Sequence, residues 1–219
     1  MNIALNKFDS IRPYQDHEVN STLKRLSSDK NIIDTILRTN SYPFIKNLPF
    51  SKSLMPLILW RRVRNIKTIK GYQEIFEAIV TNIIDKSIDN FSVSGIENIS
   101  RDKSYLFISN HRDITLDSAL LNLTLHKNGF NTTNNAVGNN LLNEKWASDL
   151  MRLNRSFIID RSDKSKKDIY KSLFLASEFI SMSLTEKNES IWIAQKQGRS
   201  KDGVDSVSYT HLTLPTTPY

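Results

Sequence analysis

A histidine and two carboxylates follow a short apolar stretch in YLFISNHRDITLD, which runs from Tyr105 to Asp117. The apolar residues predict a strand, and the residues after Thr115 predict a helix, so His111 lies at a strand-to-helix junction. Open α/β sheets place active sites at such junctions, where helix N–H groups are free to bind anions. A neutral His111 oriented by Asp117 or Asp113 fits a general base that takes a proton from an alcohol.

The same residues allow two other interpretations. Asp113 can cap the helix while His111 is an ordinary loop residue and Asp117 faces solvent. His111, Asp113 and Asp117 also offer nitrogen and oxygen ligands to a metal ion. No other histidine-rich cluster supports a metal site, so none is predicted. These residues alone leave the general base and the capped loop as equal alternatives.

Two downstream segments end apolar stretches with cations. SFIIDR, from Ser156 to Arg161, predicts a buried strand, and an arginine at its exit can hold a phosphate through bidentate hydrogen bonds. IWIAQKQGRSKDG, from Ile191 to Gly203, predicts a strand that enters a glycine-containing loop. That loop carries Lys196, Arg199 and Lys201. Taken singly, the first segment is more readily explained as a surface ion pair and the second as a basic turn.

In this order, the three segments resemble the phospholipid/glycerol acyltransferase family, which includes 1-acylglycerol-3-phosphate and glycerol-3-phosphate acyltransferases. That family has a His-(x)4-Asp motif after a strand, a later strand ending near an arginine, and a Glu-Gly-x-Arg loop. FISNHRDITLDSALLN, ASDLMRLNRSFIIDR and IWIAQKQGRSKDG are similar to a bacterial subgroup of it. The resemblance covers about Phe91 to Gly203, and the N-terminal FDSIRPYQDHEV is similar to the same subgroup.

The resemblance implies an enzyme of phospholipid biosynthesis that moves a fatty acyl group from acyl-CoA or acyl-carrier protein to a hydroxyl of a glycerol-phosphate or lysophospholipid. His111 would deprotonate the hydroxyl, and Asp117 would orient His111, with Asp113 as its rival. Arg161 would bind the phosphate of the acceptor. No metal or redox cofactor is implied. The remaining substrate-binding residues would be Asn110, Arg112, Gly198 and Arg199.

The chain departs from the family pattern in three places. Five residues, not four, separate His111 from Asp117. Gln197 stands where an acid is expected, and Gly198 directly precedes Arg199. The family's fourth motif, a short apolar strand with proline, is absent. An inactive acyltransferase-like fragment is therefore an alternative to the enzyme.

The elements that position these residues fall into two parts. Residues 1–90 predict a helical segment, with helices over Asp16 to Leu26, Lys30 to Leu37 and Gly71 to Ile88. Residues 91–206 predict an α/β domain with a mostly parallel sheet and flanking helices. Its short apolar strands are expected to be buried on both faces. The strands are Phe91 to Val93, Tyr105 to Ser109, Asn135 to Val137, Phe157 to Ile159 and Ile191 to Ala194, and the helices are Leu116 to Lys127, Leu141 to Leu153 and Lys166 to Leu184.

The last thirteen residues, 207–219, read VSYTHLTLPTTPY and contain no Asp, Glu, Lys or Arg. They resemble the translation of a sequencing-library adapter. We therefore expect this tail to be non-native and the α/β domain to be incomplete.

Composition limits the partners and the chemistry. Thirty Lys+Arg against 23 Asp+Glu give a net charge of +7, which favours anionic partners. The lack of cysteine excludes disulfides and thiolate chemistry.

From Pro43 to Lys70 an apolar run precedes clustered cations, a pattern that suits an anionic membrane surface or a core-packed segment with a basic face. No secretory signal or membrane-spanning run is evident, so the expected location is cytoplasmic, or peripheral on the cytoplasmic face of the membrane. A basic module that binds membrane or nucleic acid is the remaining alternative, although no nucleic-acid-binding motif is present.

Overall fold

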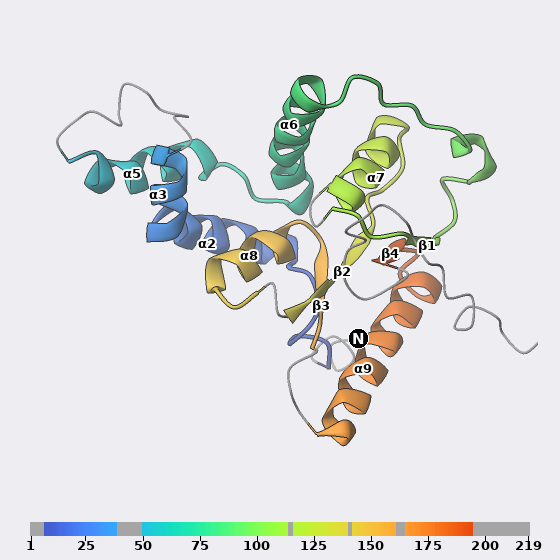
Figure 1. Ribbon diagram of the computed structural model, residues 1–219. Coiled ribbons are helices and arrows are strands. Elements are labelled where there is room, and N and C mark those ends of the chain that lie inside the picture. Colours follow the sequence, from blue (N-terminus) through green and yellow to red (C-terminus); the bar gives the residue numbers. More distant parts are fainter. Residues whose placement is uncertain (1–6, 39–49, 114–115, 140–141, 161–164, 195–219) are drawn as a thin grey trace, which may run out of the picture.

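A parallel four-stranded sheet forms the centre of the α/β region (Figure 1). The computed structural model describes residues 7–38, 50–113, 116–139, 142–160 and 165–194. The strands are β1 (Leu106–Ser109), β2 (Asn134–Gly138), β3 (Ser156–Ile159) and β4 (Ile191–Ala194). They lie in the order β1-β4-β2-β3, and all three pairings are parallel. The predicted α/β class with a mostly parallel sheet is confirmed.

Three helices make the crossovers that parallel strands require. α7 (Leu116–Lys127) connects β1 to β2, α8 (Lys145–Leu153) connects β2 to β3, and α9 (Lys166–Thr185) connects β3 to β4. α7 and α9 lie on opposite sides of the sheet (Figure 1). Because the strands are parallel, the residues that follow β1, β2 and β3 all meet at one edge, which we call the carboxyl edge.

The preceding helices are α2 (Asp16–Ser27), α3 (Lys30–Arg38), α5 (Ser51–Val63) and α6 (Ile69–Ser87), followed by the short 3₁₀ helix η1 (Ile96–Asn98). α2 packs Val19 and Leu23 into a cluster that contains Leu153 of α8. α6 packs Val80 against Leu123 of α7. The N-terminal helices therefore share their core with the α/β region, and the domain boundary at residue 90 stays a prediction.

The core beneath the sheet is built on aromatic rings. Phe157 of β3 and Phe179 of α9 are 0% and 2% exposed, and their ring centroids are 4.9 Å apart. Phe8 meets Phe179 edge-on at 5.6 Å. Truncating a buried phenylalanine to alanine typically costs about 3–5 kcal/mol, so this cluster anchors α9 to the sheet.

A charged cluster holds the strands together at the amino edge, which is the end of the sheet where the strands begin. Arg155 precedes β3 with a φ of 57°, a left-handed conformation that is unusual for a residue with a side chain. Its guanidinium lies 2.9 Å from Glu189 Oε1 and donates to Asn134 Oδ1 at 3.0 Å. Asn134, which is buried at 2% exposure, donates in turn to Glu189. The starts of β2, β3 and β4 are thereby held together.

Two strand predictions were wrong. Phe91 to Val93 forms no strand, and Phe91 and Val93 are 42% and 48% exposed. This short apolar stretch finds no partner strand among the described residues and is followed by a turn at Gly95 with a φ of 84°. β1 is not buried on both faces, because Leu106 and Ile108, which lie on the same face of the strand, are 41% and 44% exposed.

The apolar run within Pro43 to Lys70 is divided between core and surface. Residues 43–49 lie outside the described part of the chain, and α5 continues through Pro56. Met55 is fully buried against α3. The opposite face exposes Phe50, Leu54 and Leu57. The predicted core packing is therefore confirmed at Met55, whereas the membrane-surface interpretation stays a prediction.

α6 is divided in the same way. Phe76 and Ile84 pack inward, whereas Ile75, Ile79 and Ile83 are exposed. None of the helices in the described ranges is long and apolar enough to cross a membrane.

Candidate active site

His111 and Asp117 form a hydrogen-bonded pair at the carboxyl edge. His111 Nδ1 lies 2.8 Å from Asp117 Oδ2, and the two side chains are 17% and 18% exposed. The same oxygen accepts the main-chain N–H groups of Arg112 at 2.8 Å and Asp113 at 3.1 Å. Asp117 sits in the first turn of α7, where the helix dipole favours a negative charge. The turn wraps around this carboxylate, which shows how the five-residue spacing still brings the two side chains together.

Asp113 lies at the start of α7. Its Oδ1 accepts the main-chain N–H of Leu116 at 2.8 Å, which is the contact expected of a helix-capping carboxylate. The carboxylate on Nδ1 of His111 is that of Asp117. The predicted alternative in which Asp117 faces solvent is therefore wrong, while the capping role of Asp113 is confirmed.

The contact with Asp117 fixes the chemistry available to His111. A neutral imidazole beside a carboxylate keeps its proton on the facing nitrogen, here Nδ1. Nε2 then carries the lone pair. Because a carboxylate at Nδ1 also stabilises the imidazolium, the pair can accept a proton at Nε2 from a bound hydroxyl.

Trp192 is a neighbour of His111 that the sequence did not reveal. Its ring meets the imidazole at 69° with the centroids 6.2 Å apart. Its Nε1–H donates to Ser109 Oγ at 3.0 Å, and the residue is 5% exposed. Trp192 lies on β4, which pairs with β1 so that Phe107 is its register partner. Only the strand order brings Trp192 beside His111, so no local signal in the sequence could have found it.

Of the other candidate residues, two lie at the carboxyl edge within the described residues and three lie outside the described residues. Asn110 is exposed, and its carbonyl accepts the Ser109 hydroxyl at 3.0 Å. The side chain of Arg112 is exposed at the same edge. Arg161, Gly198 and Arg199 lie outside the residues that the structure describes, as does Gln197.

Two polar residues that the sequence did not single out meet at this edge. Asn139 follows β2 and donates through Nδ2 to a carboxylate oxygen of Asp160, which follows β3. This contact joins the ends of the two strands next to position 161. It is a product of strand order, because the two residues are 21 positions apart in the sequence.

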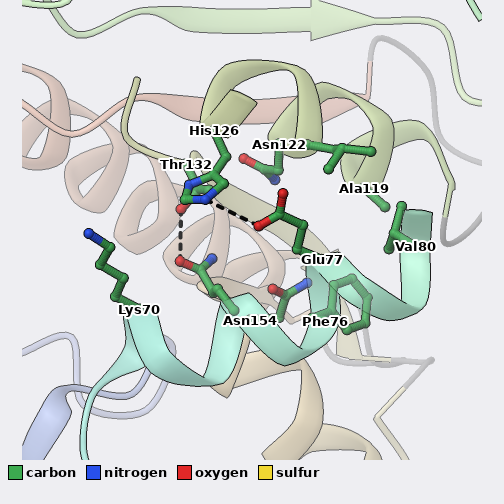
Figure 2. Close-up of a pocket in the computed structure, with 11 residues that line it drawn as sticks. Lys70, Phe76, Glu77, Val80, Ala119, Asn122, His126, Thr132 and Asn154 are labelled. Atoms are coloured by element: carbon green, nitrogen blue, oxygen red, sulfur yellow. Dashed lines mark hydrogen bonds and ion pairs between the residues drawn. The ribbon is translucent and has the colours of Figure 1, made fainter. Parts of the chain in front are cut away.

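A small cavity lies between α6 and α7 (Figure 2). Its apolar wall includes Phe76, Val80 and Leu123. At its rim His126 Nε2 lies 3.2 Å from Glu77 Oε2, and these side chains point toward one another in Figure 2. The volume is about 50 Å³, whereas pockets for drug-sized ligands span about 300–1,000 Å³. The cavity is therefore a packing feature between the two helices.

Metal ligation was the third possibility considered for His111. Within the described ranges, no three His, Cys, Asp or Glu side chains come together in a group that could hold a metal ion. The arrangement that is present, one imidazole on one carboxylate, is suited to proton transfer.

Comparison with known proteins gives the site its family. No curated protein matches the chain. A family model described as Acyltransferase matches residues 90–203, which is more than half of the chain. The match extends from before β1 to beyond β4, so it includes the four strands, the His111–Asp117 pair and the positions of Arg161 and Arg199. The chain belongs to the acyltransferase family.

Proposed function

We propose that the protein transfers a fatty acyl group from a thioester, either acyl-CoA or acyl-carrier protein, to a hydroxyl of a glycerol-phosphate or lysophospholipid. The observation that carries the proposal is the 2.8 Å contact between His111 and Asp117 at the carboxyl edge, inside the segment that matches the acyltransferase family. The imidazole side chain is 17% exposed, so the ring is not sealed from solvent.

In the proposed reaction, Nε2 of His111 takes the proton of the acceptor hydroxyl. The hydroxyl oxygen attacks the thioester carbonyl carbon, and the tetrahedral intermediate collapses with cleavage of the C–S bond. The thiolate leaves and receives the proton from Nε2, which returns His111 to its neutral form. Asp117 stabilises the imidazolium in between. Binding both substrates side by side supplies proximity without a covalent acyl-enzyme.

The acceptor phosphate would be held by Arg161, with Gly198 and Arg199 in a second phosphate-binding loop. Asn110 and Arg112 flank His111 and would contribute at the same edge. The net charge of +7 supports an anionic substrate and a peripheral position on the cytoplasmic face of the membrane. Gln197 is the residue that weakens the second loop, since a neutral amide cannot form the ion pairs of an acid.

The test is release of free thiol from an acyl-CoA, followed with and without glycerol 3-phosphate or lysophosphatidate. Wild-type protein should release thiol only when an acceptor is present. His111→Ala should lose about 10²–10⁴-fold in rate while its circular dichroism spectrum stays unchanged. His126→Ala, a histidine on the far side of α7, is the matched control and should retain most of the activity.

Arg161→Ala separates binding from chemistry in the same assay. We expect a higher KM for the acceptor, equivalent to about 1.5–3 kcal/mol, with kcat less affected. An active His111→Ala enzyme would remove the mechanism. Wild-type protein that releases no thiol with any acceptor would favour the inactive acyltransferase-like fragment or the basic membrane-binding module.

A further inference from the structure

The first half of α9 exposes four large apolar side chains. Ile169, Tyr170, Leu173 and Phe174 are 39%, 69%, 50% and 53% exposed, and we call them the α9 apolar face. The exposed positions in the second half of the helix are small or polar, namely Ser177, Ser181 and Thr185. Packing against the sheet therefore does not account for the α9 apolar face.

This face lies at the end of α9 that adjoins the carboxyl ends of the strands. Ser172 Oγ donates to the main-chain oxygen of Asp160 at 3.0 Å, which places Ser172 level with the end of β3. The helical residues that precede Ser172 begin at Lys166, so about 9 Å of helix projects past the strand end. It projects beyond the carboxyl edge at β3, and His111 lies at the same carboxyl edge after β1, on the other side of the sheet.

The charge around the α9 apolar face is positive. Lys166, Lys167 and Lys171 are exposed in the same two turns. The acid among them, Asp168, accepts the Ser165 hydroxyl at 2.7 Å and serves the helix start. Long lysine stems can lie along an apolar surface while their ammonium groups reach anionic headgroups.

The aromatic pair in this face also suits a membrane boundary. The rings of Tyr170 and Phe174 stack, with centroids 6.3 Å apart and planes 23° apart. Phe174 offers a wholly apolar ring, and Tyr170 adds a hydroxyl that can stay in the headgroup layer. An amphipathic helix with apolar aromatic and lysine side chains typically lies in the plane of the interface.

We propose that the α9 apolar face inserts into the headgroup boundary of an anionic bilayer, so that a lipid acceptor reaches His111 from the membrane at the carboxyl edge. The role in acceptor delivery rests on the proposed function, whereas the binding itself does not. α5 also exposes apolar side chains, but it lies at the far end of the N-terminal helices from the strands (Figure 1).

The chain contains no cysteine, so a single introduced cysteine can be labelled selectively to test the proposal. Phe174→Cys, labelled with an environment-sensitive fluorophore, is mixed with vesicles of phosphatidylcholine with and without phosphatidylglycerol. Leu57→Cys reports the competing surface on α5. Ile79→Cys reports the exposed stripe on α6 that Ile79 forms with Ile75 and Ile83, and Ser181→Cys, exposed in the polar second half of α9, is the matched control that should show no shift.

We expect a blue shift at position 174 with the anionic vesicles and no shift at position 181. Replacing both Lys166 and Lys167 with glutamine should weaken vesicle binding roughly 30-fold, since each juxtamembrane lysine contributes about a fivefold factor. A blue shift at position 57 or 79 without one at position 174 would overturn the proposal. So would a probe at position 174 that shifts when an acidic carrier protein is added but not when anionic vesicles are added.

Vesicle binding is measured without an acyl donor, so it does not depend on catalysis. His111→Ala should bind the vesicles as the parent does. Acyl transfer without any vesicle response at 174 would leave the proposed function standing and remove the α9 surface. Vesicle binding without acyl transfer would leave the α9 surface standing and remove the proposed function.

Discussion

Asp117 and Asp149 are both carboxylates with several hydrogen-bond donors, but their partners come from different distances along the chain. Asp117 accepts from His111 and from two main-chain N–H groups, all within six residues. Asp149 of α8 accepts the Tyr14 hydroxyl and Arg25 Nε, both at 2.7 Å, from residues more than 120 positions away. Asp117 is 18% exposed, and Asp149 is 1% exposed.

The difference separates a carboxylate that shapes a site from one that joins two parts of the fold. Burial by itself would raise the pKa of Asp149, but the hydrogen bonds from Arg25 and Tyr14 and the nearby cations lower it below the ordinary value. The pKa of Tyr14 is raised by its burial and by Asp149. We therefore expect substitution of Asp149 to reduce stability and substitution of Asp117 to reduce activity.

Of the substitutions compared here, Asp117→Asn should reduce the rate of acyl transfer most. The amide can no longer stabilise an imidazolium, and it can donate to Nδ1 and so favour the wrong tautomer. The rate of acyl transfer should fall at least about 100-fold, while urea unfolding changes little. Asp113→Asn keeps the capping oxygen of α7 and should lose much less activity. Equal losses in the two variants would show that the assignment of Asp117 over Asp113 is wrong.

Asp149→Asn should have the opposite profile. It leaves Arg25 and Tyr14 with a neutral partner, so the free energy of unfolding should fall by about 1.5–3 kcal/mol. Urea denaturation followed by circular dichroism measures this directly, and acyl transfer below the unfolding transition should stay near the parent rate. If Asp149→Asn lost activity without losing stability, the contrast between the two carboxylates would fail.

The pH dependence of stability sharpens the contrast further. The pKa of Glu18 is also lowered, because hydrogen bonds from Arg12 and the main chain outweigh the effect of burial. Groups with lowered pKa stabilise the fold above their unfolded values, near 4, and lose that contribution as the pH falls through the folded values. Urea unfolding at several pH values from 7 to 3 should show this loss. The loss should be smaller in Asp149→Asn, and an unchanged pH dependence would contradict the role of Asp149.

Trp192→Phe should have the smallest effect on activity. The phenyl ring keeps an aromatic wall beside His111 but loses the hydrogen bond to Ser109 Oγ, which is worth about 0.5–1.5 kcal/mol. We expect kcat to fall about 2- to 12-fold with little change in KM. Trp146→Phe on α8 is the matched control, since it removes an indole from the cluster around Leu153 and not from the site. A KM effect without a kcat effect would place Trp192 in substrate binding instead.

The sequence predicted the parts of this molecule that depend on neighbouring residues. Strand and helix periodicity located β1, β3, β4, α7 and α9 to within a residue or two. The strand-to-helix junction placed His111 and Asp117 in one turn. Asp149 and Trp192 could not be found in this way, because their partners are set by packing between distant segments.

Tertiary packing also outweighs local propensity at Pro56 and in the polar run before β2. Pro56 interrupts the apolar run in the sequence, yet the helix passes through it with Met55 fully buried against α3. The polar run from Lys127 to Asn135 has the composition of a loop. Thr133 and Asn134 are nevertheless buried, with Asn122 accepting the N–H of Thr133 at 2.7 Å. Buried polar residues of this kind are fixed by partners that composition does not show.

The strand order has a consequence for protein synthesis. Among the described strands β1 has one neighbour, β4, and Leu106 pairs with Ile191, 85 residues later in the chain. At about 5–20 residues per second, a ribosome needs roughly 4–17 s to make that stretch. Throughout this interval the apolar strand that leads to His111 is without its partner, and Trp192 has yet to be added. The nascent chain therefore depends on protection of β1, and slower translation between β1 and β4 should increase aggregation.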